Sequence, residues 1–383
     1  MAVGSDSHGD LVFIGCLTRP TPYFANAHGI GILICRFDTE TGALIQIGAC
    51  TGIENPAWLT VDNDAARLFA CSEVFEWDQG RVTAYQILDD SDTPHLAKLG
   101  ERPSCGSITA YASLDRSRTK LLVANYCLDA PNRSEESGIA VFPIAADGSL
   151  ESASALLSHD GFSLGPNAAR QERPHAHAVL ASPDNRFLLM ADLGIDRVLS
   201  YRFDAMTGTV AAGPAAILSM KPGAGPRHLA FHPNGSCFYV INELDSSIAV
   251  VAFDCAAGSL ELLQCVSTLP PASAIANDAC AIALTPDGRF LYATNRGHES
   301  VAIFAVDPAG GWLTAKGHVP SGGRTPRCLT VDPGGRFALV SNQNSDNVAV
   351  FRIEQASGAL TLAASPVAVG TPMCIAFLRS GRG

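Results

Sequence analysis

The chain has 383 residues, of which 47% are hydrophobic and only 16% are charged, and it is rich in glycine (35) and proline (23). This composition suits many short strands and tight turns rather than long helices. The formal net charge of -11 argues against nucleic acid as a partner, because such binding depends on basic patches. A small anionic ligand is still possible, since a few arginines in a cleft set the local field.

The N-terminal stretch MAVGSDSHGD has no basic region followed by an apolar run, so we expect no signal peptide. No uninterrupted apolar run approaches the roughly 20 residues that span a membrane. The twelve cysteines include no CxxC pair, and most lie in apolar runs, as Cys71, Cys237 and Cys328 do. We therefore predict a cytoplasmic protein with no membrane association and no disulfide framework.

The first half of the chain contains strand patterns that only partly repeat. The N-terminal segment DLVFIGCLTRP…GIGILICRFDTETGALIQIG supplies three strands. Two degenerate units follow, with Asn63 and Arg116 near the place of a turn proline. The second unit carries an expanded segment, APNRSEES, which we interpret as part of a longer surface loop at 127–137.

The second half repeats clearly, with turn prolines 50, 53 and 47 residues apart at Pro183, Pro233, Pro286 and Pro333. A period of this size indicates stacked or radially arranged units. Each unit has an apolar run, a Pro-Asp-Gly type turn, a second run, a polar turn, an alternating run and a weaker fourth strand. The turn residues favour hairpins, and four antiparallel strands at this period are typical of a propeller blade.

Counting the first strand of each unit gives seven: NPAWLTV, SITAYAS, HAHAVLA, PRHLAFH, CAIALT, PRCLTVD and PMCIAFL. The last lies after Gly370, and the three N-terminal strands complete its blade, which closes the ring and removes exposed sheet edges. The sequence therefore predicts an all-β, seven-bladed β-propeller of four-stranded antiparallel blades, as a single domain over 1–383. A multi-domain chain is the alternative, but the repeat runs through every candidate boundary.

Two positions of the repeat are predicted to meet at one mouth of the central channel. The start position, six residues before the turn proline, opens the innermost strand. The end position, ten residues after the proline, closes the next strand, which runs in the opposite direction. Along the chain, the start position holds Ala57, a poorly aligned residue near Ser107, His177, Arg227, Cys280, Arg327 and Met373. The end position holds Glu73, Tyr126, Leu193, Glu243, Arg296 and Gln343.

These positions gather charged groups, which favours a functional site over an ordinary wet channel mouth. Several arginines predict a carboxylate or phosphate ligand, held through planar forks. A histidine and a glutamate without metal-ligand spacing suit general acid–base catalysis. A metal site of His175 and His177, two residues apart on one strand face, is a weaker alternative. No GxSxG elbow or glycine-rich phosphate loop is present.

Several other residues are weaker candidates. His298, in the turn after Arg296, either reaches a ligand or faces water. Trp58 and Trp77 are expected to pack in the core rather than line the mouth. A set of polar residues recurs one place before the end position, which indicates turn hydrogen bonding rather than chemistry: Asn125, Asp192, Asn242, Asn295 and Asn342.

Nearly the whole chain resembles the lactonase family of seven-bladed propellers, which includes the propeller type of 6-phosphogluconolactonase and the fungal carboxy-cis,cis-muconate cyclases. The most specific stretches are GPNAARQERPHAHAVLASPDNRFLLMADLGIDRV, GPRHLAFHPNG…VINELDSS, ATNRGHESVAIF and SNQNSDNVAVFRI. The resemblance implies a metal-independent site without a cofactor at the channel mouth. It implies catalytic roles for His177, Arg227, Glu243 and Arg296, with His177 or Glu243 activating water. We further predict substrate contacts from Arg327, Glu73, Gln343, His175 and His298.

Three functions remain open from the sequence. The first is hydrolysis of an anionic sugar lactone such as 6-phosphogluconolactone. The second is cycloisomerisation of an unsaturated carboxylate, since the same acid and base would serve it. The third is a non-catalytic propeller scaffold, which the arginine-rich channel disfavours. Many family members carry Pro-x-His before the third blade, but here the stretch is RPSCGSITAYAS, so a specialised lactone is also plausible. We expect a monomer or weak homo-oligomer.

Overall fold

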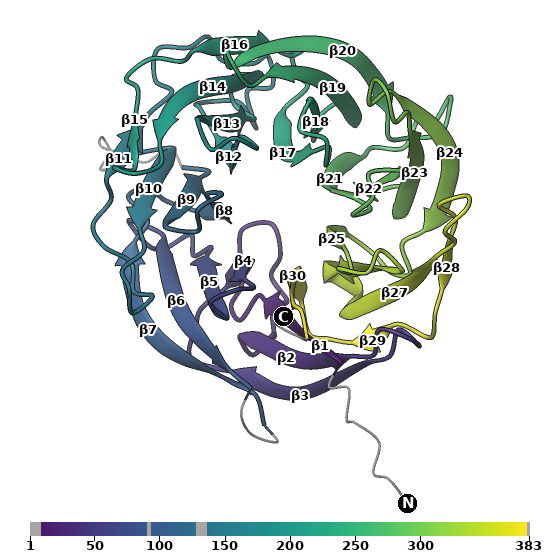
Figure 1. Cartoon of the computed structure of the whole chain (residues 1–383). Coiled ribbons are helices and arrows are strands. Elements are labelled where there is room, and N and C mark those ends of the chain that lie inside the picture. The colour runs from purple at the N-terminus through teal and green to yellow at the C-terminus, as the bar shows by residue number, and fades with distance from the viewer. Residues whose placement is uncertain (1–8, 90–92, 128–135, 381–383) are drawn as a thin grey trace, which may run out of the picture.

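Seven antiparallel β-sheets are arranged in a ring in the computed structural model, which describes residues 9–89, 93–127 and 136–380 (Figure 1). The predicted seven-bladed propeller is therefore confirmed. The first blade has the strand order β3-β2-β1-β30, so it joins the two ends of the chain as expected. Its strands are β1 (Asp10–Cys16), β2 (Ile32–Phe37), β3 (Leu44–Cys50) and β30 (Pro372–Leu378).

The next three blades follow in chain order from the innermost to the outermost strand. The second blade has β4 (Pro56–Asp62), β5 (Arg67–Ser72), β6 (Arg81–Leu88) and β7 (His95–Pro103). The third has β8 (Thr109–Leu114), β9 (Lys120–Asn125), β10 (Ile139–Pro143) and β11 (Ala155–Leu157). The fourth has β12 (Ala176–Ala181), β13 (Phe187–Asp192), β14 (Arg197–Asp204) and an outer edge split into β15 (Thr209–Val210) and β16 (Ala216–Ser219).

The last three blades repeat this plan. The fifth has β17 (Pro226–Phe231), β18 (Cys237–Asn242), β19 (Ser247–Asp254) and β20 (Ser259–Ser267). The sixth has β21 (Asp278–Leu284), β22 (Phe290–Arg296), β23 (Ser300–Val306) and β24 (Leu313–Pro320). The seventh has β25 (Pro326–Val331), β26 (Phe337–Asn342), a 3-10 turn η1 (Gln343–Ser345), β27 (Asn347–Ile353), β28 (Leu360–Leu362) and β29 (Val367–Ala368).

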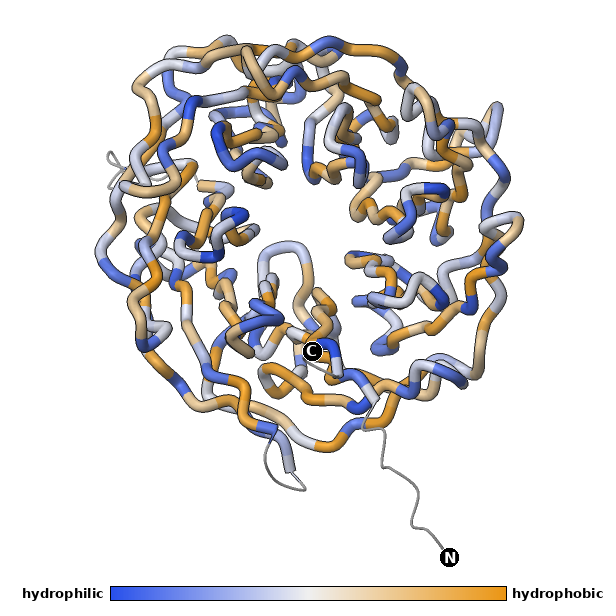
Figure 2. Tube along the Cα trace, viewed as in Figure 1, coloured by the Kyte–Doolittle hydropathy of each residue, from blue (hydrophilic) through white to orange (hydrophobic). Residues whose placement is uncertain are grey.

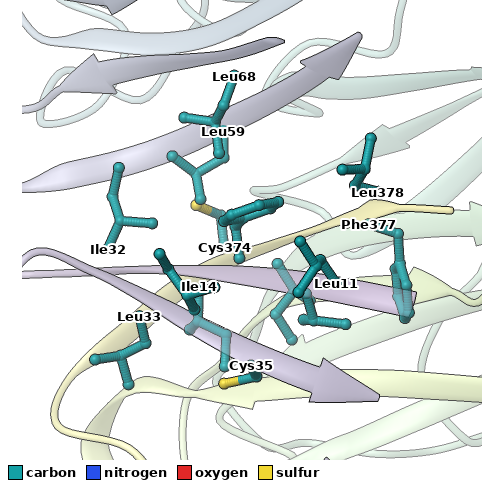
Figure 3. Close-up of a cluster of buried hydrophobic side chains, with 14 of the residues drawn as sticks. Leu11, Ile14, Ile32, Leu33, Cys35, Leu59, Leu68, Cys374, Phe377 and Leu378 are labelled. Atoms are coloured by element: carbon teal, nitrogen blue, oxygen red, sulfur yellow. The ribbon is translucent and has the colours of Figure 1, made fainter. Parts of the chain in front are cut away.

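The second strand of each blade is buried on both faces because neighbouring blades pack against it. Strands β9, β13, β18 and β26 are buried along their whole length, whereas the outer strand β20 is mostly half-buried or exposed. Hydrophobic stretches accordingly run through the blades, and hydrophilic ones concentrate at turns (Figure 2). A close-up of the closing blade shows side chains from both chain ends in one core, including Leu11, Ile14, Phe377 and Leu378 (Figure 3). Burial of this apolar surface holds the ring closed.

A β-bulge recurs at the start position of the innermost strand. In β17, for example, Pro226 pairs with Asn242 and His228 pairs with Ile241, so Arg227 is left as the extra residue. A bulge bends its strand and re-aims a side chain. The same break in pairing occurs in four other innermost strands and leaves out Ala57, Ala110, His177 and Arg327.

The bulge also corrects the alignment of the third blade. The sequence placed its start position near Ser107, but the break in pairing lies between Thr109 and Tyr111, so the equivalent residue is Ala110. Ser107 lies in the segment before β8 and is buried. Counting back six residues from the turn residue Arg116 also gives Ala110, so the spacing of the repeat holds in this blade and only the alignment near Ser107 was wrong.

Candidate active site

A cavity of about 720 Å³ opens at the channel mouth where the start and end positions were predicted to meet. Its wall combines charged groups with aromatic rings and short apolar side chains. Seven of the nine predicted site residues line it: Glu73, His177, Arg227, Glu243, Arg296, Arg327 and Gln343.

Glu243 is surrounded by arginines. Its Oε2 accepts a hydrogen bond from Arg227 Nε at 2.7 Å and lies 3.1 Å from Arg296 Nη2, while its Oε1 accepts from Arg170 Nη2. Burial alone would raise the pKa of this carboxyl, but the three guanidinium charges outweigh it and hold the pKa well below its usual range. Glu243 is therefore ionised, and the cluster as a whole carries an excess of positive charge.

The backbone of the fifth blade sets the direction of Glu243. Its N–H donates to the carbonyl of Gly225 at 2.7 Å, across the bulge that carries Arg227. Gly225 has φ +67°, and a Cβ there would lie 2.6 Å from Leu244 Cγ, so only glycine fits comfortably. The start and end positions of this blade are thus fixed side by side.

His177 lines the same cavity as a neutral imidazole. Burial, followed by the charge of Arg227, holds its pKa well below the usual value. Its Nδ1 is buried and has no hydrogen-bond partner among the residues that the structure describes. The His177 ring makes T-shaped contacts with the rings of Tyr126 and His228, whose centroids lie 5.8 Å and 5.3 Å away. At neutral pH this ring is therefore unprotonated, and its lowered pKa makes it a weaker base than an ordinary histidine.

His228 also lines the cavity, although in a regular strand its side chain would point to the face opposite to that of Arg227. The bulge turns both neighbours toward the channel, and Arg227 Nη1 lies 2.8 Å from His228 Nε2. Burial and the charge of Arg227 hold the pKa of His228 well below its usual value. The indole of Trp58 packs against this imidazole with ring centroids 5.0 Å apart. Trp58 also lines the cavity, although the sequence placed it only in the core.

A second polar group, formed by Tyr23, Glu73 and Arg327, lies in another part of the cavity wall. Tyr23 donates its hydroxyl hydrogen to Glu73 Oε1 at 2.6 Å, and the guanidinium carbon of Arg327 lies 4.8 Å from the centre of the Tyr23 ring. Arg327 Nη2 and Glu73 Oε2 are 3.9 Å apart. Tyr23 belongs to the connection between β1 and β2, which arches toward the centre of the ring in purple (Figure 1). The sequence analysis missed it because this connection has no counterpart in the repeat.

Two predicted substrate-binding residues lie outside the described cavity lining. His175 is fully buried, bonds the carbonyl of Tyr126 through Nδ1 at 2.7 Å and stacks on the Tyr126 ring. Its Nε2 lies 3.1 Å from Glu172 Oε1. His298 bonds Ser300 Oγ at 2.7 Å and packs edge-on against His318. Both rings thus support neighbouring segments, and we no longer assign them substrate contacts.

Arg170 is the main residue of the site that sequence reasoning missed. It lies in the segment between β11 and β12, where no repeat position exists to align it. Its only signal was its place in the NAARQERPHAH stretch, a polar segment just before the strand that carries His177.

The recurrent polar residues before the end position make the expected turn hydrogen bonds. Asn125 donates to the carbonyls of Ser104 and Ser137, and Asp192 Oδ1 accepts from the N–H groups of His175 and Gly194. These contacts fix the loops at the channel mouth. The third-blade loop predicted at 127–137 lies mostly outside the described residues.

Among the residues that the structure describes, no group of three or more His, Cys, Asp or Glu side chains is arranged to hold a metal ion. Over the same ranges, no helix is long and apolar enough to cross a membrane. All twelve cysteines are free. The cytoplasmic location stays a prediction.

Comparison with known proteins agrees with this architecture. The family model described as Lactonase, 7-bladed beta-propeller matches residues 11–377. A 6-phosphogluconolactonase of Bacillus subtilis is 33% identical over 348 residues, which is 91% of this chain and 94% of that protein.

Solved structures agree equally well. The periplasmic gluconolactonase of Pseudomonas aeruginosa matches with a TM-score of 0.86 at 32% identity. The match covers 97% of this chain and 99% of that one. A protein from Lactobacillus plantarum matches with a TM-score of 0.84 at 32% identity over 97% of this chain and 99% of its own. These relatives support lactone hydrolysis as the broad activity. The chain belongs to the lactonase family of seven-bladed β-propellers.

Proposed function

We propose that the protein hydrolyses an anionic sugar lactone, such as 6-phosphogluconolactone, by general acid–base catalysis in the channel-mouth cavity. The observation that carries this proposal is the pairing of a neutral imidazole, His177, with an arginine-bound carboxylate, Glu243, in one cavity of about 720 Å³. Relatives named as a 6-phosphogluconolactonase and a gluconolactonase support the substrate class.

His177 is the better candidate for the general base. A carboxylate in contact with three guanidinium groups is a weak proton acceptor, because protonation would forfeit those interactions. The imidazole of His177 is neutral at neutral pH and accepts a proton without breaking an ion pair, although burial and the charge of Arg227 make it a weaker base than an ordinary histidine. Of the two residues left open by the sequence, we therefore assign the base to His177 and give Glu243 the task of holding Arg227 and Arg296 in place.

In the proposed reaction, ring opening proceeds in two stages. The oxygen of a water molecule attacks the lactone carbonyl carbon while His177 takes one of its protons. Arg227 and Arg296 stabilise the negative charge that develops on the carbonyl oxygen. The bond from the carbonyl carbon to the ring oxygen breaks, and the ring oxygen takes the proton back from His177 to become a hydroxyl. The products are the open hydroxy acid, as a carboxylate, and one released proton.

The test is hydrolysis of freshly prepared 6-phosphogluconolactone by the pure protein. The rate of proton release is measured and compared with the rate of spontaneous hydrolysis. A second sample is treated with EDTA, because the proposal routes no step through a metal. Rapid turnover that resists EDTA is the expected result. Turnover no faster than the spontaneous reaction would overturn the assignment of this substrate.

A further inference from the structure

Arg170 is the arginine of the site that lies nearest to solvent. We propose that it selects lactones carrying a second anionic group, a phosphate monoester remote from the reacting carbonyl, and that Gln171 and Asp196 hold it in position. This inference rests on the proposed function and deepens it, since it names the residue that separates a phosphorylated lactone from its neutral counterpart.

The exposure of the three arginines around Glu243 gives their order from the interior to the mouth. The side chain of Arg227 is 5% exposed, that of Arg296 is 16% exposed and that of Arg170 is 36% exposed. In the proposed reaction the lactone carbonyl lies beside His177 and Arg227, which are both buried. A group at the far end of the substrate therefore meets Arg170 rather than Arg227.

Arg170 retains the capacity to bind an anion. A guanidinium has five N–H donors in a planar fork that matches phosphate oxygens. Contacts with Glu243 and with the Tyr126 hydroxyl use part of this set. The single charge of Glu243 is shared among three arginines, so these four side chains together keep an excess of positive charge, which the Asp278 carboxylate near Arg296 reduces. The Glu172 carboxylate, 3.1 Å from His175 Nε2, is a further negative group in the same cavity lining.

Gln171 anchors the segment that carries Arg170. Its buried amide Nε2 donates to the carbonyl of Leu193 and to Asp196 Oδ1, both at 2.8 Å, and its Oε1 accepts from the N–H of Asn167. A Cβ at Gly165 would lie about 2.2 Å from this amide, so the chain is packed tightly around it. The preceding residue, Arg170, is therefore presented to the cavity from a fixed backbone.

Asp196 connects this anchor to the strand that carries Arg227. Its Oδ1 also accepts from the N–H of Gly225 at 2.8 Å, and its Oδ2 accepts from the N–H of Gly223 at 2.7 Å. Gly225 lies two residues before Arg227. One buried carboxylate thus fixes both segments, which sets the spacing between the outer arginine and the inner one.

The experiment compares freshly prepared 6-phosphogluconolactone with unphosphorylated gluconolactone in the full-length protein. For Arg170→Gln we expect kcat/KM to fall at least tenfold (about 1.4 kcal/mol) on the phosphorylated lactone and less than threefold on the neutral one. Arg170→Lys keeps the charge and should lie between wild type and Arg170→Gln. The matched control is Arg324→Gln, which removes an exposed arginine that lines a neighbouring pocket and bonds the carbonyl of Asn344.

Gln171→Met tests the positioning role, because it keeps the volume and removes the hydrogen bonds. We expect the preference for the phosphorylated lactone to fall as in Arg170→Gln, through KM, with kcat on the neutral lactone unchanged. Equal losses on both substrates in Arg170→Gln, or no loss on either, would overturn the proposal. A parallel loss of selectivity in Arg324→Gln would also overturn it, since net charge would then explain the effect.

Calorimetric titration with 6-phosphogluconate and gluconate separates failure of this inference from failure of the proposed function. If the wild type hydrolyses neither lactone, the proposed function is wrong, and binding decides the role of Arg170. A wild-type preference for the phosphorylated acid that disappears in Arg170→Gln supports the inference. Absence of a preference, or its survival in the variant, contradicts it.

Discussion

Glu243 and Glu73 occupy the same position in two different blades, yet their surroundings differ. Glu243 contacts Arg227, Arg296 and Arg170, whereas Glu73 accepts a hydrogen bond from Tyr23 and lies 3.9 Å from its nearest arginine nitrogen, on Arg327. The repeat directs both carboxylates to the cavity. Their partners decide what each does, and the outermost partner in each case, Arg170 or Tyr23, comes from a segment outside the repeat.

We infer that the two carboxylates serve two tasks at one channel mouth, bond cleavage and substrate recognition. The Glu243 side combines ionised groups with the neutral ring of His177, which suits bond cleavage. The Glu73 side offers a hydroxyl, a carboxylate and the amide of Gln343, whose buried Oε1 has no hydrogen-bond partner within the described ranges. Such groups suit recognition of sugar hydroxyls.

The largest difference is expected between two matched substitutions. Glu243→Gln leaves three guanidinium groups around a neutral amide, so the arginines lose their common anchor, and we expect kcat/KM to fall by about 100-fold or more. Glu73→Gln keeps a hydrogen-bond acceptor for Tyr23 and should cost less than about tenfold, mostly in KM. Steady-state kinetics of both variants, with circular dichroism to confirm folding, would check this. Equal losses would remove the distinction between the two carboxylates.

Stability should decline in acid with a contribution from His177. Its native pKa is lowered, so between that value and the ordinary value near 6.5 the unfolded chain binds a proton that the native ring does not. The free energy of unfolding therefore falls as pH drops below about 6.5, by up to about 1.4 kcal/mol per pH unit for one proton. Below about 4.5 Glu243 adds a loss of the same sign, because its native pKa is also lowered.

Urea unfolding at a series of pH values would measure this slope. His177→Asn should make the decline below pH 6.5 less steep, and the remaining slope should come from His228, whose native pKa is also lowered. Replacing the exposed His95 of β7 should leave the slope unchanged. An unchanged slope in His177→Asn would show that the native ring is not held neutral.

The smallest effect is expected from Tyr23→Phe. This change removes the hydrogen bond to Glu73 but keeps the ring beneath the Arg327 guanidinium. A single hydrogen bond to a charged group contributes about 1.5–3 kcal/mol when buried, and the half-exposed Tyr23 should give less, about two- to fivefold in KM. Kinetics on the proposed lactone would detect it. A loss in kcat with no change in KM would place Tyr23 in the chemistry instead.

The sequence predicted the propeller because turn residues and apolar runs recur at a nearly constant period. It also predicted seven residues of the cavity wall, since a repeat sends equivalent positions to equivalent places. It failed where the period gives no guidance. Arg170 and Tyr23 lie on connections without counterparts, the bulge turns His228 inward beside Arg227, and a bond to Ser300 holds His298 outside the lining.

The most direct test of the account is the rate at which His177→Asn hydrolyses 6-phosphogluconolactone, measured beside calorimetric binding of 6-phosphogluconate. Loss of a general base should lower kcat by about 100- to 10,000-fold, while the arginines still bind the product with near wild-type affinity. That result would confirm His177 as the base. A variant with near wild-type kcat would contradict the account and return the role of base to another group in the cavity.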